Sequence, residues 1–138
     1  MDTSFAISAR SLQYYVMARK WFSDLEFFKI ETAFFHRLID ENIKKLSDEG
    51  HIMQFLSTGK KLLKLENDES KTDNLLTEQL KQLELMAEDV IPEDVDALAA
   101  TQIHLENFIA NLMKEYRVIK QEIFHLIAAV KHEPSIAS

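Results

Sequence analysis

The chain has 138 residues, of which 46% are hydrophobic and 28% are charged, and its formal net charge at pH 7 is −7. This length suits one domain, and the composition is that of a globular chain rather than a disordered one. The negative charge argues against nucleic acid and against an anionic membrane surface, because both need basic side chains. The absence of cysteine excludes disulfides. With only two glycines and two prolines the chain can form few turns, so we expect long helices.

The first predicted helix covers residues 11–47. Apolar side chains recur in it at alternating spacings of four and three residues, which indicates a helix with one buried face. Ser8 or Ser11 is expected to cap its start, and the sequence DEG at 48–50 predicts its stop and a turn. The residues of the buried face are Tyr14, Ala18, Trp21, Leu25, Phe28, Thr32, Phe35, Ile39 and Leu46, with Asn42 as the single polar member.

Two shorter amphipathic stretches follow, at residues 51–65 and 72–91. The segment between them, residues 66–73, has the sequence ENDESKTD and contains no apolar side chain. Such a segment is typical of a surface connection, so the chain there either breaks between two helices or continues as one long helix.

Charge decides which of these two versions we prefer. A continuous helix would place Glu66, Glu69 and Asp73 on the buried face, and burying three unpaired carboxylates is costly. We therefore expect a surface break with Ser70 or Thr72 capping the next helix. A continuous helix, straight or bent, is the alternative.

The last predicted helix covers residues 94–132. Pro92 and Asp94 favour its start, since proline suits a first turn and aspartate a cap. Glu133-Pro134 predicts its end, and residues 135–138 are expected to be a frayed tail. The residues of its buried face are Leu98, Leu105, Ile109, Leu112, Tyr116, Ile119, Ile123, Leu126 and Val130, with Gln102 as the polar member.

Together these elements predict an all-α fold, an up-and-down antiparallel helical bundle forming a single domain over residues 1–138. The preferred version has four helices, two long and two short, and the alternative has three long ones. The four helices cover about residues 11–47, 51–65, 72–91 and 94–132. The three-helix version resembles a spectrin-type repeat in helix length and in having Trp21 well inside the first helix. Because the chain shows no tandem copies, we do not assign it to that family.

A membrane or secretory role finds no support in the sequence pattern. The N-terminal residues lack a basic start followed by an apolar core, and there is no run of about 18 apolar residues. We therefore expect a cytoplasmic protein. Two glycines cannot build a phosphate-binding loop, no glycine-flanked serine offers a nucleophile, and we expect no cofactor and no enzymatic activity.

A metal-binding bundle of the di-iron or hemerythrin-like kind is one functional hypothesis. Carboxylates and histidines occur along the first helix, but Glu26, Glu31, His36 and Glu41 are spaced by five residues and scatter around it. One Glu-x-x-His motif occurs, at 122–125. The candidate ligands gathered toward one end of the bundle are His36, Asp40, His51, Glu122 and His125.

A protein interaction surface on the first helix is the preferred hypothesis. Eight of the thirteen aromatic residues fall between positions 14 and 35, more than one buried face needs. Burial in a central helix is the simpler explanation of this excess. The functional explanation is an exposed edge that binds a second copy of the chain or another protein. The candidate partner-binding residues are Tyr15, Phe22, Phe27, Ile30 and Phe34. The sequence thus predicts a small non-enzymatic interaction or scaffold protein that self-associates.

Overall fold

The structure, a computed structural model, describes residues 7–130. Over this range the chain forms three helices and no strand: α1 (Ala9–Ile43), α2 (Glu49–Ala87) and α3 (Val95–Val130). The all-α prediction is confirmed. The predicted helix end at Glu133-Pro134 and the predicted tail at 135–138 lie outside the described residues.

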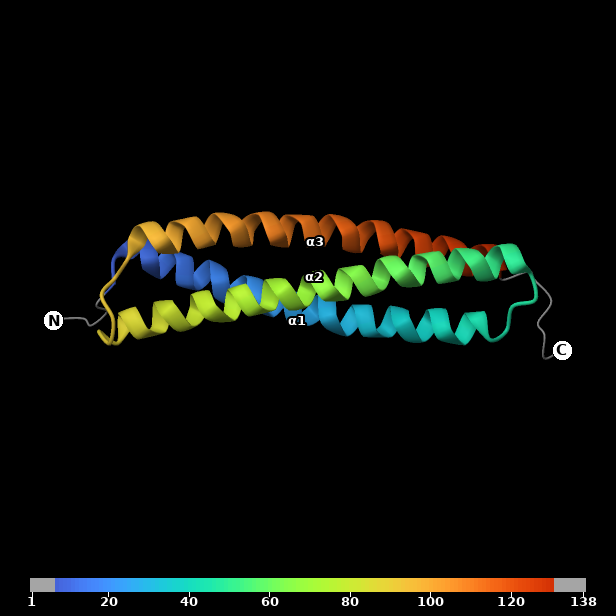
Figure 1. Cartoon of the computed structure of the whole chain (residues 1–138), viewed down its shortest axis with the longest axis horizontal. Helices are drawn as coiled ribbons and strands as arrows, with labels where there is room; N and C mark the ends of the chain where they lie inside the picture. Colours follow the sequence, from blue (N-terminus) through green and yellow to red (C-terminus); the bar gives the residue numbers. More distant parts are fainter. Residues whose placement is uncertain (1–6, 131–138) are drawn as a thin grey trace. The chain divides into compact units, whose positions relative to one another are not determined.

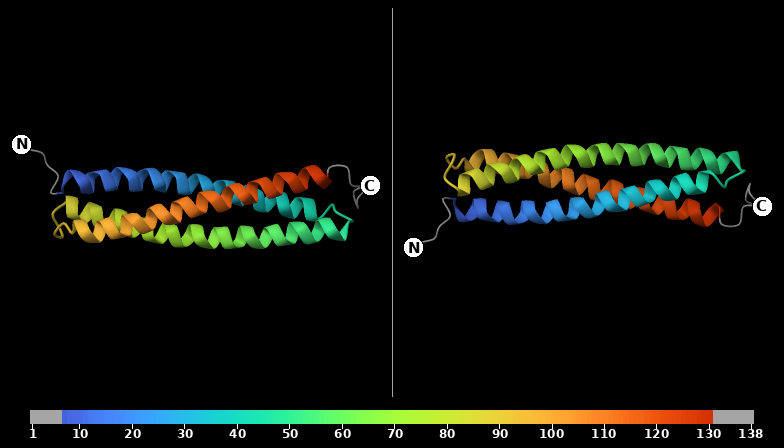
Figure 2. Two further views of the ribbon diagram at one scale, coloured as in Figure 1. Left: turned by 90° about the horizontal axis from the view of Figure 1, so that it is seen from above. Right: turned by 90° about the horizontal axis from the view of Figure 1, so that it is seen from below.

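The three helices divide into two compact units, each containing one segment of every helix. Unit 1 consists of Met1–Glu26 and Ser70–Asn111, and unit 2 of Phe27–Glu69 and Leu112–Ser138. Within each unit the α1 and α3 segments run in the same direction and the α2 segment runs against them (Figure 1). Figure 2 shows from two further sides that the three segments of a unit lie side by side. Each unit is thus an up-and-down helical bundle, while a single domain for the whole chain stays a prediction.

The predicted break at residues 66–73 is wrong, because α2 is continuous from Glu49 to Ala87. The four-helix version, with separate helices at 51–65 and 72–91, is therefore replaced by three long helices. The error came from treating three carboxylates as buried and unpaired. Only Glu69 is fully buried, and it hydrogen-bonds Thr32, whereas Glu66 and Asp73 are half-buried. Thr72 is a buried residue inside the helix and not a cap.

Side-chain caps begin each of the three helices. The N–H of Ser11 donates to Oγ of Ser8 at 3.2 Å, which confirms one of the two predicted caps of α1. Asp94 caps α3 as predicted, since its Oδ1 accepts the N–H of Ala97 at 3.1 Å. Asp48 was predicted to end the first helix, but it begins α2 by accepting the N–H of Gly50 at 2.9 Å. The first helix has already ended at Ile43.

The end of α2 is closed by an aspartate in the left-handed conformation. Asp89 has a φ of 61°, the region that glycine adopts most easily. The N–H of Val90 donates to the carbonyl of Leu85 at 2.9 Å and that of Asp89 to the carbonyl of Met86 at 3.1 Å. This is the Schellman pattern of bonds, which satisfies the last carbonyl groups of a helix.

The buried faces of α1 and α3 follow the predicted spacing closely. All ten predicted positions of the last helix are buried, including Gln102. On α1 the prediction holds apart from Tyr14, Phe28 and Asn42, which are half-buried, whereas Leu46 is buried but lies beyond the end of the helix. The residues buried in unit 1 are Ser11, Ala18, Trp21, Leu25, Thr72, Leu76, Gln79, Leu80, Leu83, Met86, Leu98, Gln102, Leu105 and Ile109. Those buried in unit 2 are Thr32, Phe35, Ile39, Leu46, Phe55, Thr58, Leu62, Leu65, Glu69, Leu112, Tyr116, Ile119, Ile123, Leu126 and Val130.

Candidate interaction surface

Two of the five predicted partner-binding residues belong to unit 1, and both are half-buried there. Tyr15 packs against the core cluster of Leu83, Met86 and Leu98. The guanidinium carbon of Arg19 lies 5.7 Å from the centre of the Phe22 ring, within the range of a cation–π contact. These two aromatic side chains already have packing partners within unit 1, so they are not the centre of a free surface.

The other three predicted residues form an exposed strip on the α1 segment of unit 2. Phe27, Ile30 and Phe34 are 55%, 70% and 42% exposed. Their spacings of three and four residues bring them onto one face of the helix, turned away from buried Thr32 and Phe35. Their exposure does not agree with the simpler explanation of the aromatic excess, which was burial in a central helix. We call these three residues the α1 apolar face.

Ring contacts join the α1 apolar face to the interior of unit 2. The ring of Phe27 lies 6.2 Å from that of Phe28, which in turn lies 4.9 Å from Tyr116 of α3. Buried Phe35 lies 6.0 Å from both Phe34 and Tyr116. These centroid distances are those of favourable aromatic pairs. The exposed rings are therefore the outer members of a continuous aromatic array.

The same array reaches a second exposed ring on α3. Phe124 is 49% exposed and meets Phe35 edge to face at 6.1 Å. The sequence did not single out this residue, because the interaction hypothesis followed the aromatic excess between positions 14 and 35 and Phe124 lies on the last helix. The signal for its exposure is its position one residue after the predicted core residue Ile123, which turns it about 100° around the helix.

Charged side chains contact the aromatic array at Tyr116 and at Phe34. The hydroxyl of Tyr116 donates a hydrogen bond to Oε1 of Glu31, and Lys120 lies 3.7 Å from the same oxygen. Burial, together with the neighbouring Glu31 carboxylate, raises the pKa of Tyr116. At the edge, the guanidinium of Arg37 lies 5.9 Å from the centre of the Phe34 ring. The rings are thus held in place by specific contacts.

A groove between α1 and α2 of unit 2 was not predicted. It has a volume of about 440 Å³, and its lining includes Met53, Leu56 and Leu63, which are 66%, 48% and 59% exposed. Leu56 and Leu63 each lie one residue beyond a core position, Phe55 or Leu62. The α2 segment of unit 2 thus has two adjacent apolar stripes, and the neighbouring helices bury only the one that contains Phe55 and Leu62.

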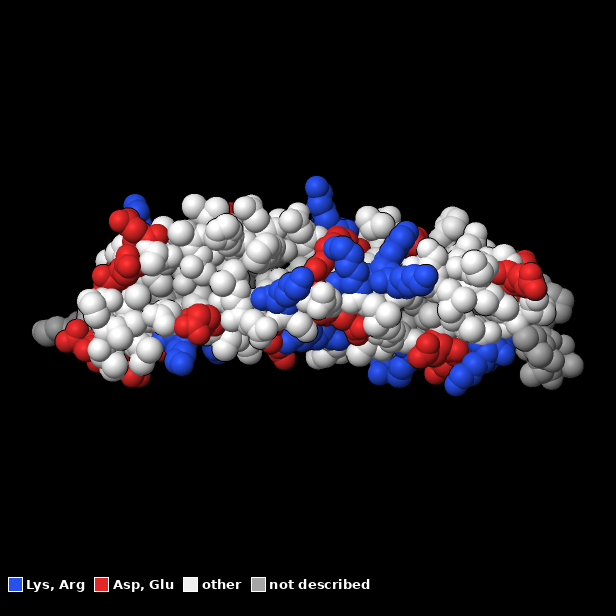
Figure 3. Space-filling model, viewed as in Figure 1, with Lys and Arg blue, Asp and Glu red and all other residues white. Residues whose placement is uncertain are grey.

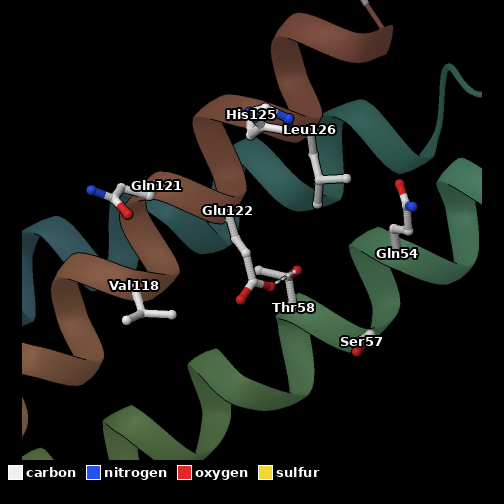
Figure 4. A pocket seen from close by; sticks show the side chains of 8 residues that line it. All are labelled: Gln54, Ser57, Thr58, Val118, Gln121, Glu122, His125 and Leu126. Carbon is white, nitrogen blue, oxygen red and sulfur yellow. Dashed lines mark hydrogen bonds between the residues drawn. The ribbon is translucent and has the colours of Figure 1, made fainter.

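A second hollow, of about 450 Å³, lies between α2 and α3 of unit 2 and is more polar. Oγ1 of Thr58 donates to Oε1 of Glu122 at 2.9 Å, and Nζ of Lys61 donates to Oε2 at 2.8 Å. Figure 4 shows Glu122 reaching from α3 to Thr58, while Gln121 and His125 point away from this contact. Burial alone would raise the pKa of Glu122, but the bonds from Lys61 and Thr58 outweigh it and lower the pKa. Glu122 is thus an ionised structural partner here.

The five candidate metal ligands all belong to unit 2, and the structure divides them. His36 and Asp40 line the groove between α1 and α2, whereas Glu122 and His125 line the hollow between α2 and α3. Nδ1 of His51 lies 3.3 Å from the carboxylate of Asp48, which begins the same helix.

The histidine on α1 also has an acidic neighbour of its own. Nε2 of His36 lies 2.7 Å from Oε1 of Glu66 on α2. In residues 7–130 no group of three or more His, Cys, Asp or Glu side chains is arranged to hold a metal ion. The geometry of the described residues therefore gives the metal hypothesis no support.

Positive and negative side chains are mixed on the face shown in Figure 3, where Lys and Arg gather beside Asp and Glu over α2 and α3. In unit 2, Nζ of Lys64 bridges Asp68 at 2.8 Å and Glu115 at 3.0 Å. The hydrogen bonds to Asp68 and Glu115 raise the pKa of Lys64. These pairs neutralise one another, so the gathered lysines are not by themselves an anion site.

Comparisons with known proteins found no relative of this chain. No protein-family model matches the chain, and the searches of curated proteins and of solved structures found no match either. Within residues 7–130, none of the helices has the length and apolar character needed to cross a membrane.

Proposed function

We propose that this chain is a small non-enzymatic interaction or scaffold protein that self-associates through the α1 apolar face. One observation carries the proposal: Phe27, Ile30 and Phe34 stand exposed in succession on one helix face, supported from beneath by the aromatic array. Aromatic residues are enriched at the centres of protein interfaces because they bury a large area at a small entropic cost. A cytoplasmic location is part of the proposal and rests on the sequence alone.

Self-association is preferred over another protein partner because the face is largely apolar and lies on a single helix. Two such strips can pack against each other, as the apolar strips of paired helices do. Arg37, which contacts Phe34, provides a cation at the edge that can also meet an aromatic ring of a second copy. A different protein with an amphipathic helix is the other partner that this chemistry accepts.

The test is the mass in solution of the full chain, whose monomer mass is 16.0 kDa. We expect light scattering to give a mass above that of the monomer at high protein concentration. The double substitution Phe27→Ser with Phe34→Ser should return the mass to the monomer value, because it removes two exposed rings from the face. Circular dichroism should show unchanged helix content, since both side chains are about half exposed.

A matched control uses exposed apolar residues of unit 1. Phe108 and Ile103 on α3 are 42% and 59% exposed, close to the values of Phe34 and Phe27. Replacing both with serine should leave the mass of the wild-type assembly unchanged. An intact double variant at positions 27 and 34 with the same mass as the wild type would contradict self-association through this face.

A further inference from the structure

A carboxyl group is enclosed between α1 and α2 in unit 2. Glu69 is only 3% exposed, and Thr32 opposite it on α1 is fully buried. Oγ1 of Thr32 lies 2.8 Å from Oε2 of Glu69 and 2.7 Å from the carbonyl oxygen of Phe28. The second contact is the common hydrogen bond from a threonine hydroxyl to the backbone carbonyl four residues earlier in the same helix.

These two short contacts need two protons, and a threonine hydroxyl has one. The carbonyl oxygen of Phe28 has none, whereas Glu69 has one to give when its carboxyl group is protonated. A neutral carboxylic acid has an O–H that donates to Oγ1 of Thr32, which in turn donates to Phe28. An ionised carboxylate only accepts, so the two contacts must then share the single proton of the Thr32 hydroxyl.

The charges of α1 and α2 around Glu69 oppose one another. Burial is the largest influence and raises the pKa of Glu69; the Thr32 hydroxyl lowers it, the charge of Glu66 raises it and Lys29 lowers it. The net direction is upward from the ordinary value of 4.5. An uncompensated carboxylate in such a position is costly, which agrees with the proton count.

Two other titratable side chains of unit 2, His36 and Glu115, have partners of their own. On α1, one turn after Thr32, His36 lies against Glu66. On α3, Glu115 of unit 2 pairs with Lys64, which also binds Asp68 on α2. The contact of Glu69 across to α1 is its hydrogen bond with Thr32.

We propose that Glu69 is a proton-dependent contact between α1 and α2 of unit 2. With its proton, the side chain links the helices through the chain Glu69 to Thr32 to Phe28. Loss of the proton leaves a buried charge near Glu66, breaks one link and weakens the pairing of the two helices. The bundle is therefore expected to loosen in unit 2 as the solution becomes more alkaline.

The sign of the effect follows from proton binding. Below pH about 4.5, Glu69 is protonated in both the folded and the unfolded chain, and its stabilising contact is fully present. Between that pH and the raised pKa of the folded state, only the folded chain keeps the proton. Stability is therefore lost as pH rises through this window, by up to about tenfold in the folding equilibrium constant per pH unit.

Glu69→Gln tests the proposal, because its amide donates to Thr32 at every pH. In urea unfolding of the full chain, we expect the folding equilibrium constant of the variant to increase relative to that of the wild type as pH rises above about 4.5. The increase should reach up to the same tenfold per pH unit. The control Glu41→Gln changes an exposed carboxylate of unit 2 and should run parallel to the wild type. A constant difference between Glu69→Gln and wild type across this range would overturn the proposal.

A second measurement reads the proton directly and does not depend on how stable the variant is. In NMR titration of the wild-type chain, we expect one glutamate side-chain carboxyl signal to titrate above the others. That signal should be absent in Glu69→Gln. Titration of every glutamate carboxyl signal in the ordinary range would overturn the proposal as well. Neither measurement depends on self-association, so its failure and that of the proposed function are distinguishable.

Discussion

Both units join two helices through a buried polar contact, but the chemistry of the contacts differs. In unit 1, Nε2 of Gln79 donates to Oε1 of Gln102 at 3.1 Å and to the carbonyl of Leu98 at 3.0 Å. In unit 2 the contact is between Thr32 and Glu69. An amide carries its own donors and acceptors at any pH, whereas a carboxyl group can donate only while it holds a proton. The buried contact of unit 1 is thus expected to be independent of pH, whereas that of unit 2 is expected to depend on pH.

The two units also differ in how they use aromatic side chains. In unit 1, Tyr14 and Tyr15 pack against a core cluster. In unit 2, an aromatic array extends from buried Phe35 to rings that are about half exposed. The packing in unit 1 and the proposed interaction through unit 2 therefore both use aromatic residues of the same helix, α1.

The largest change in stability is expected when the buried amide of unit 1 is replaced by a carboxylate, as in unit 2. Gln79→Glu removes the amide donor and places carboxylate oxygens beside the carbonyl of Leu98 and Oε1 of Gln102. We expect a loss of about 3 kcal/mol in the free energy of unfolding near neutral pH. The new group should have a raised pKa, so stability should recover as pH falls. Urea unfolding at several pH values measures both effects.

The control for this variant is Gln13→Glu, which introduces the same charge at an exposed position of α1 in unit 1. It should change the stability by less than about 0.5 kcal/mol. Equal losses for the two variants would mean that net charge, and not the buried contact, governs the response.

A smaller effect is expected from Glu93, whose titration has the opposite sign to that of Glu69. Its carboxylate accepts the N–H of Ser8 at 2.9 Å and the hydroxyl groups of Ser8 and Ser11 at the start of α1. The bonds from Ser11 and then Ser8 lower its pKa below 4.5. Its stabilisation is therefore complete above pH about 4.5 and is lost as pH falls through the folded value.

Glu93→Gln should cost about 1 kcal/mol near neutral pH, since the amide keeps an acceptor but loses the charge. The loss should shrink in acid, where the wild-type carboxyl group is also neutral. Thermal unfolding at neutral and acidic pH measures it. Glu106→Gln, at an exposed position of unit 1, is the control, and a penalty that stays constant into acid would contradict the assignment.

The smallest effect is a gain of stability at the end of α2 in unit 1. Asp89→Gly should stabilise the chain by about 0.5 kcal/mol, because glycine adopts a φ of 61° without the steric penalty of a Cβ. Asp96→Gly, inside the first turn of α3, is the matched control and should destabilise. Chemical denaturation compares the two, and a loss for both would contradict the role given to the Schellman turn.

Much of the fold could be predicted from the sequence because the signals are local. The buried face of α3, from Leu98 to Val130, follows from spacings of three and four residues along one helix. The caps at Ser8 and Asp94 depend on groups three residues apart. The site was predicted less completely. Phe27, Ile30 and Phe34 are exposed as the interaction hypothesis requires, but Tyr15 and Phe22 are half-buried and Phe124 was missed.

The sequence by itself determined that the chain is helical, where most helices begin and which residues face inward on α1 and α3. Only the tertiary structure decided that residues 66–73 continue one helix, because Glu69 meets Thr32, which is 37 positions away. It also decided which of two apolar stripes on α2 is covered and which aromatic residues stay exposed. Helical periodicity shows where side chains point around one helix, whereas burial and hydrogen bonding depend on what a distant segment places opposite them.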